Sequence, residues 1–171
     1  MTPQEQYCVF STAWGYFGFS AEAGRIKRTC LPCQEATPVE QSLLAAGSGV
    51  YESGLMRPVQ QRIQAYFQGE PVSFGDLPLW HAGQSQFCQD VYAALRRVSS
   101  GMTVHYGELA RLAGHAGAAR AVGRAMSVNP TPLIVPCHRV VSAGLGLGGF
   151  SARGGADTKK RLLDHEKKIM A

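Results

Sequence analysis

A segment rich in proline and glycine divides the chain and limits what it can fold into. Residues 71–83 contain two prolines and two glycines. Such residues interrupt helices and strands, because proline lacks a backbone N–H and glycine has little conformational preference. The chain of 171 residues is long enough for one good core or for two small ones. The sequence therefore predicts two domains, residues 1–82 and residues 83–171.

The first predicted domain combines strands with helix. Residues 7–34 alternate aromatic or aliphatic side chains with small or polar ones, which is typical of a β-meander of two or three strands. A short helix is expected at residues 39–44. A longer helix begins at Pro58 and ends at Gly69, since proline is favoured in the first helical turn and glycine just after the last.

The second predicted domain is mostly helical. Two short helices, residues 103–113 and 118–126, are joined by the glycine-containing turn 114–117, which is the helix-turn-helix pattern. The second helix carries small residues together with Arg120 and Arg124, so its backbone is able to approach a nucleic-acid backbone closely. The alternative is a contact between two helices through small residues, and the pattern does not separate the two.

Two more helices are expected around this pair. One follows the candidate N-cap Ser85 and stops at Gly101. The last helix is expected to be capped by Asp157 and to pack through Leu162, Leu163 and Ile169. Its basic residues are all expected to face outward: Lys159, Lys160, Arg161, Lys167 and Lys168.

Positive charge is concentrated in the second part of the chain. The net charge is +5. Residues 84–171 hold twelve Lys/Arg and five Asp/Glu, which gives +7, whereas residues 1–83 hold five basic and seven acidic residues, which gives −2. Such asymmetry is expected of a polyanion-binding half joined to a near-neutral scaffold, although a solvated basic face is also common.

Five cysteines and no recognisable export signal favour reduced thiols and a cytoplasmic location. No apolar run approaches the length of a membrane span, so no membrane association is expected. Cys30 and Cys33 form a C-x-x-C pair that could bind zinc with Cys8 and His81. The second ligand pair typical of zinc sites is missing, so no metal is expected.

The candidate reactive segment is Pro136-Cys137-His138-Arg139-Val140-Val141, directly after the apolar run Leu133-Ile134-Val135. The thiolate is the nucleophilic form of cysteine, and a nearby base or cation lowers the thiol pKa from its free value of about 8.5. His138 and Arg139 are able to supply either. Cys137 could instead be a small hydrophobe in a core, and the six residues alone favour that interpretation.

Residues 87–166 resemble the O6-alkylguanine-DNA alkyltransferases, also called methylated-DNA–protein-cysteine methyltransferases. The matching segments follow the family's order and nearly its spacing: Thr103-Val104-His105-Tyr106-Gly107-Glu108-Leu109-Ala110, Ala119-Arg120-Ala121-Val122-Gly123, Asn129-Pro130, Pro136-Cys137-His138-Arg139-Val140 and Leu162-Leu163-Asp164-His165-Glu166. The Pro-Cys-His-Arg-Val core is highly specific to the family. This match makes Cys137 a candidate nucleophile and not a core residue.

The resemblance implies an α/β (α+β) fold with a ribonuclease H-like N-terminal domain and a winged-helix-like C-terminal domain that contains the helix-turn-helix. It implies a single-turnover methylated-DNA–[protein]-cysteine S-methyltransferase for DNA repair, without a cofactor. The alkyl group of O6-alkylguanine, mainly O6-methylguanine and as a further candidate O4-methylthymine, moves irreversibly to Cys137. His138 is the implied base, acting through a water, Glu166 orients it, and Asn129 braces the active-site turn.

The implied partner is double-stranded DNA containing O6-alkylguanine, bound by a monomer through the minor groove. The damaged base must be flipped out of the stack, which requires a few kcal/mol. Tyr106 is similar to the family's tyrosine that assists flipping and contacts guanine, and Arg120 is similar to its intercalating arginine. The small Ala118, Ala121 and Gly123 suit close approach to the groove.

The glycine-rich residues 144–155 are expected to form a flexible pocket wall. They lack the Gly-Lys-Ser/Thr ending of a phosphate loop. The family usually has tyrosine where this chain has Phe150, and residues 152–156 are a residue or two longer than in the family, so the resemblance does not fix the pocket size or the alkyl-size range. The resemblance implies these pocket residues: Tyr106, Val140, Phe150 and Ser151.

Two other functions fit parts of the sequence. One is a module that binds alkylated guanine without transfer, but such relatives lack the acceptor cysteine, so Cys137 argues against it. The other is a cysteine hydrolase that uses Cys137 and His138. It would need turnover and an oxyanion hole, and adjacent residues of an extended segment point to opposite sides.

Overall fold

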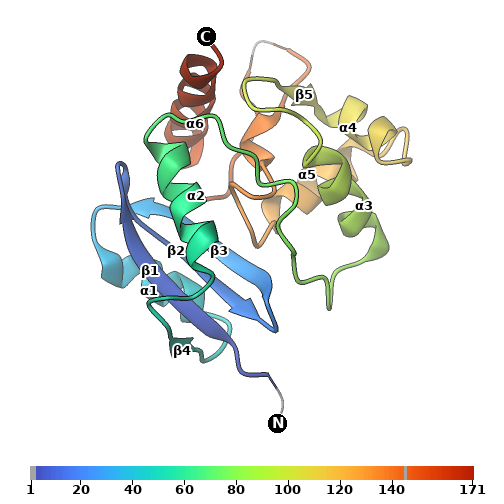
Figure 1. Ribbon diagram of the computed structural model, residues 1–171. Coiled ribbons are helices and arrows are strands. Elements are labelled where there is room, and N and C mark those ends of the chain that lie inside the picture. Colours follow the sequence, from blue (N-terminus) through green and yellow to red (C-terminus); the bar gives the residue numbers. More distant parts are fainter. Residues whose placement is uncertain (1–2, 145) are drawn as a thin grey trace. The chain divides into compact units, whose positions relative to one another are not determined.

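The computed structural model describes residues 3–144 and 146–171. The chain divides into two compact units, Met1–Trp80 and His81–Ala171 (Figure 1). The fold is mixed α+β, as the sequence predicts, with a sheet in the first unit and mainly helices in the second.

A four-stranded sheet organises the first unit. Strands β1 (Gln6–Thr12), β2 (Gly15–Glu22) and β3 (Arg25–Cys33) form an antiparallel meander, which confirms the prediction from alternating side chains. Strand β4 (Val50–Tyr51) pairs in parallel with β1, so the strand order is β3-β2-β1-β4. The central strands are therefore hydrogen-bonded on both sides.

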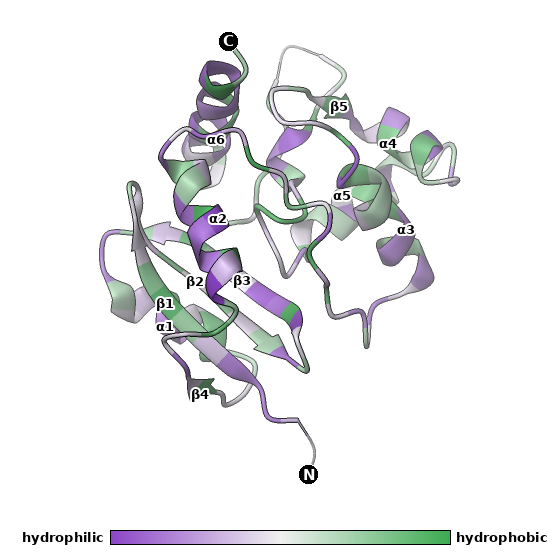
Figure 2. Cartoon of the chain, viewed as in Figure 1, coloured by the Kyte–Doolittle hydropathy of each residue, from purple (hydrophilic) through white to green (hydrophobic). Residues whose placement is uncertain are grey.

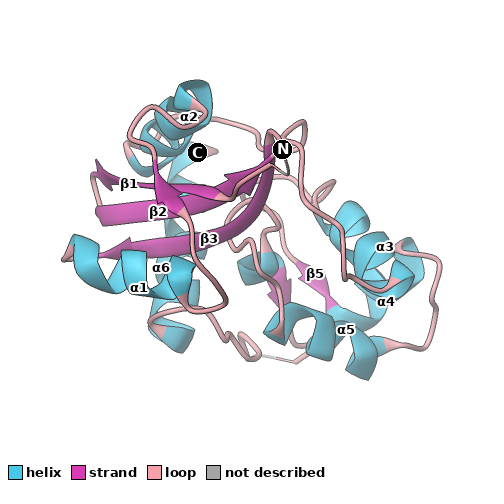
Figure 3. Ribbon diagram, turned by 90° about the horizontal axis from the view of Figure 1, so that it is seen from below, coloured by secondary structure: helices cyan, strands magenta, loops and turns pink. Residues whose placement is uncertain are grey.

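Helices cover both faces of this sheet (Figure 3). They are α1 (Ala36–Leu44) and α2 (Arg57–Phe67). The ring of Phe17 in β2 lies 6.0 Å from the ring of Phe67 in α2. The next residue, Gly18, faces α1, where a Cβ would come within 2.7 Å of a side chain of that helix. Because successive strand residues point to opposite faces, β2 is buried on both sides, and α1 can approach only because residue 18 lacks a side chain.

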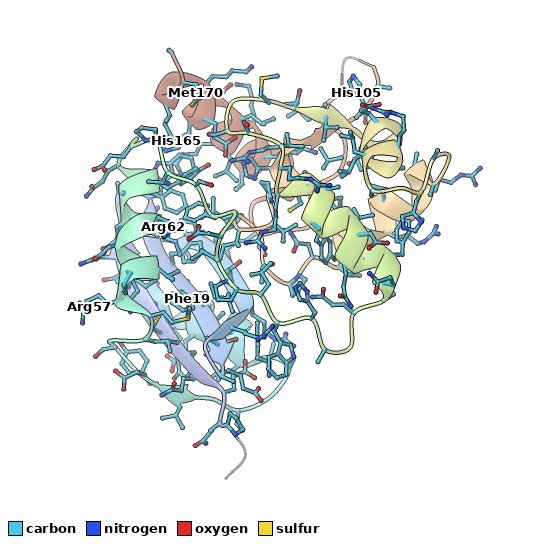
Figure 4. All side chains as sticks on the ribbon, turned by 45° about the vertical axis from the view of Figure 1, so that its right-hand side comes forward. Phe19, Arg57, Arg62, His105, His165 and Met170 are labelled. Carbon is cyan, nitrogen blue, oxygen red and sulfur yellow. The ribbon has the colours of Figure 1, made fainter. Side chains whose placement is uncertain are left out.

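The core of the first unit is apolar. Its most buried large side chains are Phe17, Phe19, Ile26, Leu31, Ile63 and Tyr66. Figure 4 shows Phe19 within this unit and Arg57, at the start of α2, extending outward. This separation is the ordinary result of burying apolar area and leaving charge in water.

Residues 71–83 do not form a free linker, which corrects the prediction. The backbone N–H of Ile26 in β3 donates to the oxygen of Pro78 at 2.9 Å, and the N–H of Trp80 donates to the oxygen of Ile26 at 2.9 Å. Leu79 therefore extends the sheet beside β3. Three apolar residues of the segment are buried, so it seals an otherwise open sheet edge.

Helices dominate the second unit. They are α3 (Gln86–Leu95), α4 (Tyr106–Leu112), α5 (Ala119–Ser127) and α6 (Gly155–Ile169). Two short parallel strands, β5 (Val104–His105) and β6 (Val140–Val141), bring the start of α4 beside the end of the Pro-Cys-His-Arg segment. Across the described parts of the chain, no helix is both long and apolar enough to cross a membrane.

The expected helix starts are partly confirmed. The Ser85 hydroxyl caps α3 by accepting a hydrogen bond from a backbone N–H in its first turn at 3.2 Å, as predicted. Helix α4 starts later than expected, with His105 as an N-cap that makes no side-chain capping bond, because residues 104–105 are strand. Its buried residues are Leu109 and Ala110, whereas Leu112 is 44% exposed.

The last helix differs from its prediction in two respects. Its N-cap is Gly154, with φ of 87°, so Asp157 lies in the first turn rather than at the cap. Lys159 is fully buried rather than facing outward. It lies on the same helical stripe as Leu162 and Glu166. Figure 2 shows that most of α6 is otherwise hydrophilic.

Candidate active site

Cys137 lies on a single 3-10 turn, Cys137–Arg139, that follows a tight apolar turn. The backbone N–H of Val135 donates to the oxygen of Thr131 at 2.9 Å, and Leu133 has φ of 79°. Leucine rarely adopts this left-handed conformation, so the surrounding packing must hold the turn. The segment is thus not extended, and the objection that adjacent strand residues point apart does not apply to Cys137 and the histidine after it.

Asn129 braces the apolar turn from inside. Its Nδ2 donates to the oxygen of Val135 at 3.0 Å, and its Oδ1 accepts from the N–H of Thr131 at 3.0 Å. An amide can do both because it carries donors and an acceptor on one group. Interaction with the Asn129 amide also acts to lower the pKa of the Cys137 thiol, against the larger effect of burial. The structure therefore brings Asn129 and Cys137 together.

His138 and Glu166 form a fully buried pair. The imidazole Nε2 lies 2.7 Å from Oε1 of Glu166, which projects from α6. A carboxylate can only accept, so Nε2 carries the proton and Nδ1 presents a lone pair. The Nδ1 atom is buried and has no hydrogen-bond partner among the described residues. It is therefore the ring nitrogen that is free to take up a proton.

Arg139 holds the same carboxylate in a forked contact. Its Nε donates to Oε2 of Glu166 at 3.0 Å and its Nη2 to Oε1 at 2.9 Å, while Nη1 donates to the oxygen of Val98 at 2.6 Å. Such a pair fixes both the position and the orientation of the carboxylate. The sequence does not by itself predict this role for Arg139. Its place directly after His138 in the motif was the available signal.

The electrostatics of the site oppose free ionisation of the thiol. Burial raises the pKa of Glu166, but hydrogen bonds from His138 and Arg139 outweigh burial and hold that pKa far below its usual value. Burial lowers the pKa of His138, with Glu166 acting in the other direction. Burial also raises the pKa of Cys137. Near neutral pH the site therefore holds a carboxylate, a neutral imidazole and a protonated thiol.

Lys159 connects two segments around the thiol. Its Nζ donates to the oxygen of Val140 at 2.6 Å and to the oxygen of Gly149 at 3.0 Å. Burial lowers the pKa of Lys159, and its ammonium favours the thiolate of the nearby cysteine. A lysine is seldom fully buried, which is why an outward orientation was expected. Its helical spacing to Leu162 and Glu166 was the signal that it faces inward.

A cavity of about 270 Å³ is lined in part by Cys137. The other lining residues come from the start of α4, from α5 and from the glycine-rich loop: Tyr106, Gly123, Met126, Ser127, Gly149, Phe150 and Ser151. Three of the four predicted pocket residues are in this set. Val140 is not. It is fully buried, its N–H donates to the oxygen of Cys137, and its oxygen accepts from Lys159.

The pocket loop closes against α4 and α5. A Cβ at Gly148, where φ is 76°, would lie 2.8 Å from the hydroxyl oxygen of Tyr106, so only glycine allows this approach. Burial raises the pKa of Tyr106 and keeps its phenol protonated. The hydroxyl of Ser151 donates to the oxygen of Ser127 at 3.1 Å. These contacts give the pocket two defined walls.

Most residues predicted to contact DNA lie on α5 or at its N-cap, whereas Tyr106 is the first residue of α4. Arg120 and Arg124 are exposed, and a Cβ at Gly123 would meet open space. The helix packs inward through a different set, Val122, Ala125 and Met126. The predicted small residues are partly buried and lie outside that set: Ala118, Ala121 and Gly123.

The possible zinc ligands do not form a cluster. Over residues 3–144 and 146–171, no group of three or more His, Cys, Asp or Glu side chains could hold a metal ion. Cys8 and Cys30 are buried in the first unit. Burial raises the pKa of Cys8 to about 12, which disfavours the thiolate that a zinc ion binds.

Comparison with known proteins gives consistent matches. The family model described as 6-O-methylguanine DNA methyltransferase, DNA binding domain, matches residues 86–168. The methylated-DNA–protein-cysteine methyltransferase of Mycobacterium leprae is 43% identical over 116 residues, which are 68% of this chain and 68% of that protein. The protein of the same name from Shigella flexneri is 38% identical over 108 residues, which are 63% of this chain but only 61% of that protein.

Structural similarity extends over both units. A crystal structure of Mycobacterium tuberculosis OGT in complex with DNA matches with a TM-score of 0.78 and 32% sequence identity. The match covers 96% of this chain and 94% of that chain. The first 80 residues, which carry little motif information, are therefore included in the likeness.

Proposed function

The chain belongs to the methylated-DNA–protein-cysteine methyltransferase family, and on this basis we propose that it repairs DNA by transferring the alkyl group of O6-alkylguanine to Cys137. One observation carries the assignment of the site. Cys137 lines a cavity, and the residue after it is a buried histidine whose Nδ1 is unpartnered among the described residues and whose Nε2 is held by Glu166.

The first step of the proposed reaction is removal of the thiol proton. Nδ1 of His138 takes the proton from Cys137 through a water, and the Glu166 carboxylate stabilises the resulting imidazolium. Arg139 keeps that carboxylate in place. Asn129 and Lys159 favour the thiolate while it exists. A base is needed because burial keeps the thiol protonated at neutral pH.

The second step is displacement at the alkyl carbon. The thiolate sulfur forms a bond to that carbon, the bond between the carbon and O6 breaks, and its electron pair goes to the guanine. The resulting guanine anion takes up a proton from water and becomes ordinary guanine, and the imidazolium of His138 releases its proton to water. Tyr106, as a neutral phenol in the pocket wall, supplies a hydrogen bond to the base. The product is a thioether, which no group in the site can cleave, so each molecule acts once.

DNA recognition follows from the same site. The target nucleotide is flipped into the cavity between Tyr106, Phe150 and Ser151. Arg120, exposed on α5, fills the space left in the base stack. The small residues of α5 allow the helix to enter the minor groove. The protein binds double-stranded DNA as a monomer.

The proposal includes three general features that the sequence predicts. Residues 1–82 and 83–171 act as separate domains, the first a scaffold and the second the carrier of DNA binding and chemistry. No cofactor takes part, because the thiol is the acceptor. The protein works in the cytoplasm, where thiols stay reduced.

The decisive test counts lesions removed from DNA. A duplex with one O6-methylguanine is incubated with substoichiometric protein, digested to nucleosides and assayed for the methylated nucleoside. We expect one lesion lost per protein molecule and then no further loss, and no loss with Cys137→Ala. Retention of the duplex without any loss would support the binding-module alternative. Loss that continues beyond one per molecule would support a hydrolase.

A further inference from the structure

The exposed side of α5 carries a second arginine beyond the one that the family comparison explains. Arg120 and Arg124 are both exposed and are four residues apart, so they are neighbours on adjacent turns of one helix. Arg120 has a proposed role in the base stack. No role is yet proposed for Arg124, which lies in the last turn of α5. Its side chain either binds a partner or stabilises the helix.

The acidic residues of this unit do not neutralise either arginine. The unit has five Asp/Glu, and four of them have a basic partner: Asp90 with His115, Glu108 with Arg111, Asp164 with Lys160, and Glu166 with His138 and Arg139. The fifth, Asp157, lies in the first turn of α6. In the part of the chain that the structure describes, no ion pair involves Arg120 or Arg124.

Arg124 is also adjacent in sequence to a residue that lines the cavity. It stands in sequence between Gly123 and Ser127, which both line the cavity. Its carbonyl oxygen accepts from the Ser127 hydroxyl at 2.7 Å, and the Ser127 oxygen in turn accepts from the hydroxyl of Ser151 on the facing loop. The backbone of Arg124 is therefore tied to Ser127, which is one of the residues that line the cavity into which a flipped nucleotide would enter.

We propose that Arg124 binds a backbone phosphate of the DNA. The inference rests on the proposed function and adds a division of labour along α5, in which Arg120 fills the stack and Arg124 grips the backbone. A guanidinium suits this task because its forked donors match phosphate oxygens. Phosphate contacts position the protein without reading sequence, as a repair protein that meets its lesion in any sequence requires.

The test is the salt dependence of binding to undamaged duplex DNA, where no transfer occurs. Losing one phosphate contact lowers the slope of log K against log salt by about 0.9. For Arg124→Gln, the affinity ratio of wild type to variant should therefore shrink by about 3.5-fold between 50 and 200 mM salt. Arg124→Lys keeps the charge and should keep most of the slope. Lys160→Gln removes an equal charge that Asp164 already pairs, and it should leave the slope unchanged.

Two results would overturn the inference. One is an unchanged slope for Arg124→Gln, which would leave Arg124 as a cation that stabilises the C-terminal end of α5. The other is an equal decrease for Lys160→Gln, which would mark a general effect of net charge. Lesion removal by the wild type is measured in parallel. A reduced slope for Arg124→Gln beside a wild type that removes no lesion supports the phosphate contact while contradicting the repair function.

Discussion

The two units bury different kinds of side chain. In Met1–Trp80, the buried polar residues among those described are the uncharged Ser20, Thr29 and Gln60. In His81–Ala171, the buried set includes four ionisable residues, His138, Arg139, Lys159 and Glu166. Burying charge is expensive unless it is paired and hydrogen-bonded. The first unit therefore buries uncharged polar groups, whereas the second must offset the cost of buried charge with ion pairs and hydrogen bonds around the proposed acceptor Cys137.

The cysteines show the same contrast. Cys8 in the first unit and Cys137 in the second are both buried, and burial raises the pKa of each thiol, that of Cys8 to about 12. Cys137 lines a cavity and is followed by a buried histidine held by a carboxylate, whereas Cys8 is followed by Val9, which cannot accept a proton. In the proposed mechanism, the proton acceptor beside the thiol, and not its depth of burial, makes Cys137 the nucleophile.

Glu166→Gln should have the largest effect. The change leaves the Arg139 guanidinium buried without its counter-charge, which should lower the free energy of unfolding by about 3–5 kcal/mol. It also removes the anion that stabilises the imidazolium, so alkyl transfer should slow by about 10²–10⁴-fold. Urea unfolding and single-turnover transfer measure the two effects. Glu108→Gln, at an exposed ion pair, is the control and should change both little. A variant with the stability and transfer rate of the wild type would show that Glu166 neither stabilises the fold nor assists alkyl transfer.

Ile63→Ala tests whether the core of the first unit contributes to stability without contributing to the chemistry. Ile63 is fully buried in the first unit, and its truncation should lower the free energy of unfolding by about 2–5 kcal/mol through lost burial and a cavity. The single-turnover rate of the protein that remains folded should be unchanged. Val50→Ala, at a 45% exposed position, serves as the control for stability. A slower chemical step in folded Ile63→Ala would show that the first unit shapes the site.

Lys159→Met should separate charge from packing within the site. The variant fills similar space but leaves the oxygens of Val140 and Gly149 without their donor, which should cost about 1–3 kcal/mol of stability. Losing the ammonium should also raise the pKa of Cys137 further, so transfer should slow and its rate should rise only at higher pH. The measurement is the pH profile of the single-turnover rate, with Lys160→Met as control. An unshifted profile would make Lys159 purely structural.

The smallest expected effect is a difference in acid sensitivity between the units. The pKa values of His138 and Glu166 are both lowered in the folded protein, so the unfolded chain binds protons first as pH falls. Stability should therefore decrease below about 6.5, where unfolded histidine protonates, and again below about 4.3 for glutamate. Hydrogen exchange at pH 7 and pH 5 should show a loss of protection in the second unit that the first does not share. Equal losses would contradict the buried network as its cause.

Regular elements were predictable because their signals are local. Alternating side chains were enough for β1 to β3, and a hydroxyl before an apolar helix was enough for Ser85. The reactive segment was found from adjacent residues in one motif. The pairing of His138 with Glu166 is implied by the resemblance alone, since no local pattern links residues 28 positions apart.

The remaining features depend on tertiary contacts. Lys159 is buried because two carbonyl oxygens accept from it, and those oxygens belong to segments distant in sequence. Leu133 is left-handed because Asn129 and Thr131 close the turn around it. The sequence predicts a linker at residues 71–83 because the pairing partner of residues 78–80, Ile26, is far away in the chain. Sequence spacing carries no information about such partners.

The central claim is that a single thiol out of five is the acceptor. It is tested most directly by peptide mapping of the protein after reaction with duplex DNA containing O6-methylguanine. We predict one added methyl group, on the peptide that contains Cys137, with four thiols unmodified: Cys8, Cys30, Cys33 and Cys88. A methyl group on any of these four, or a repaired duplex beside unmodified Cys137, would contradict the account.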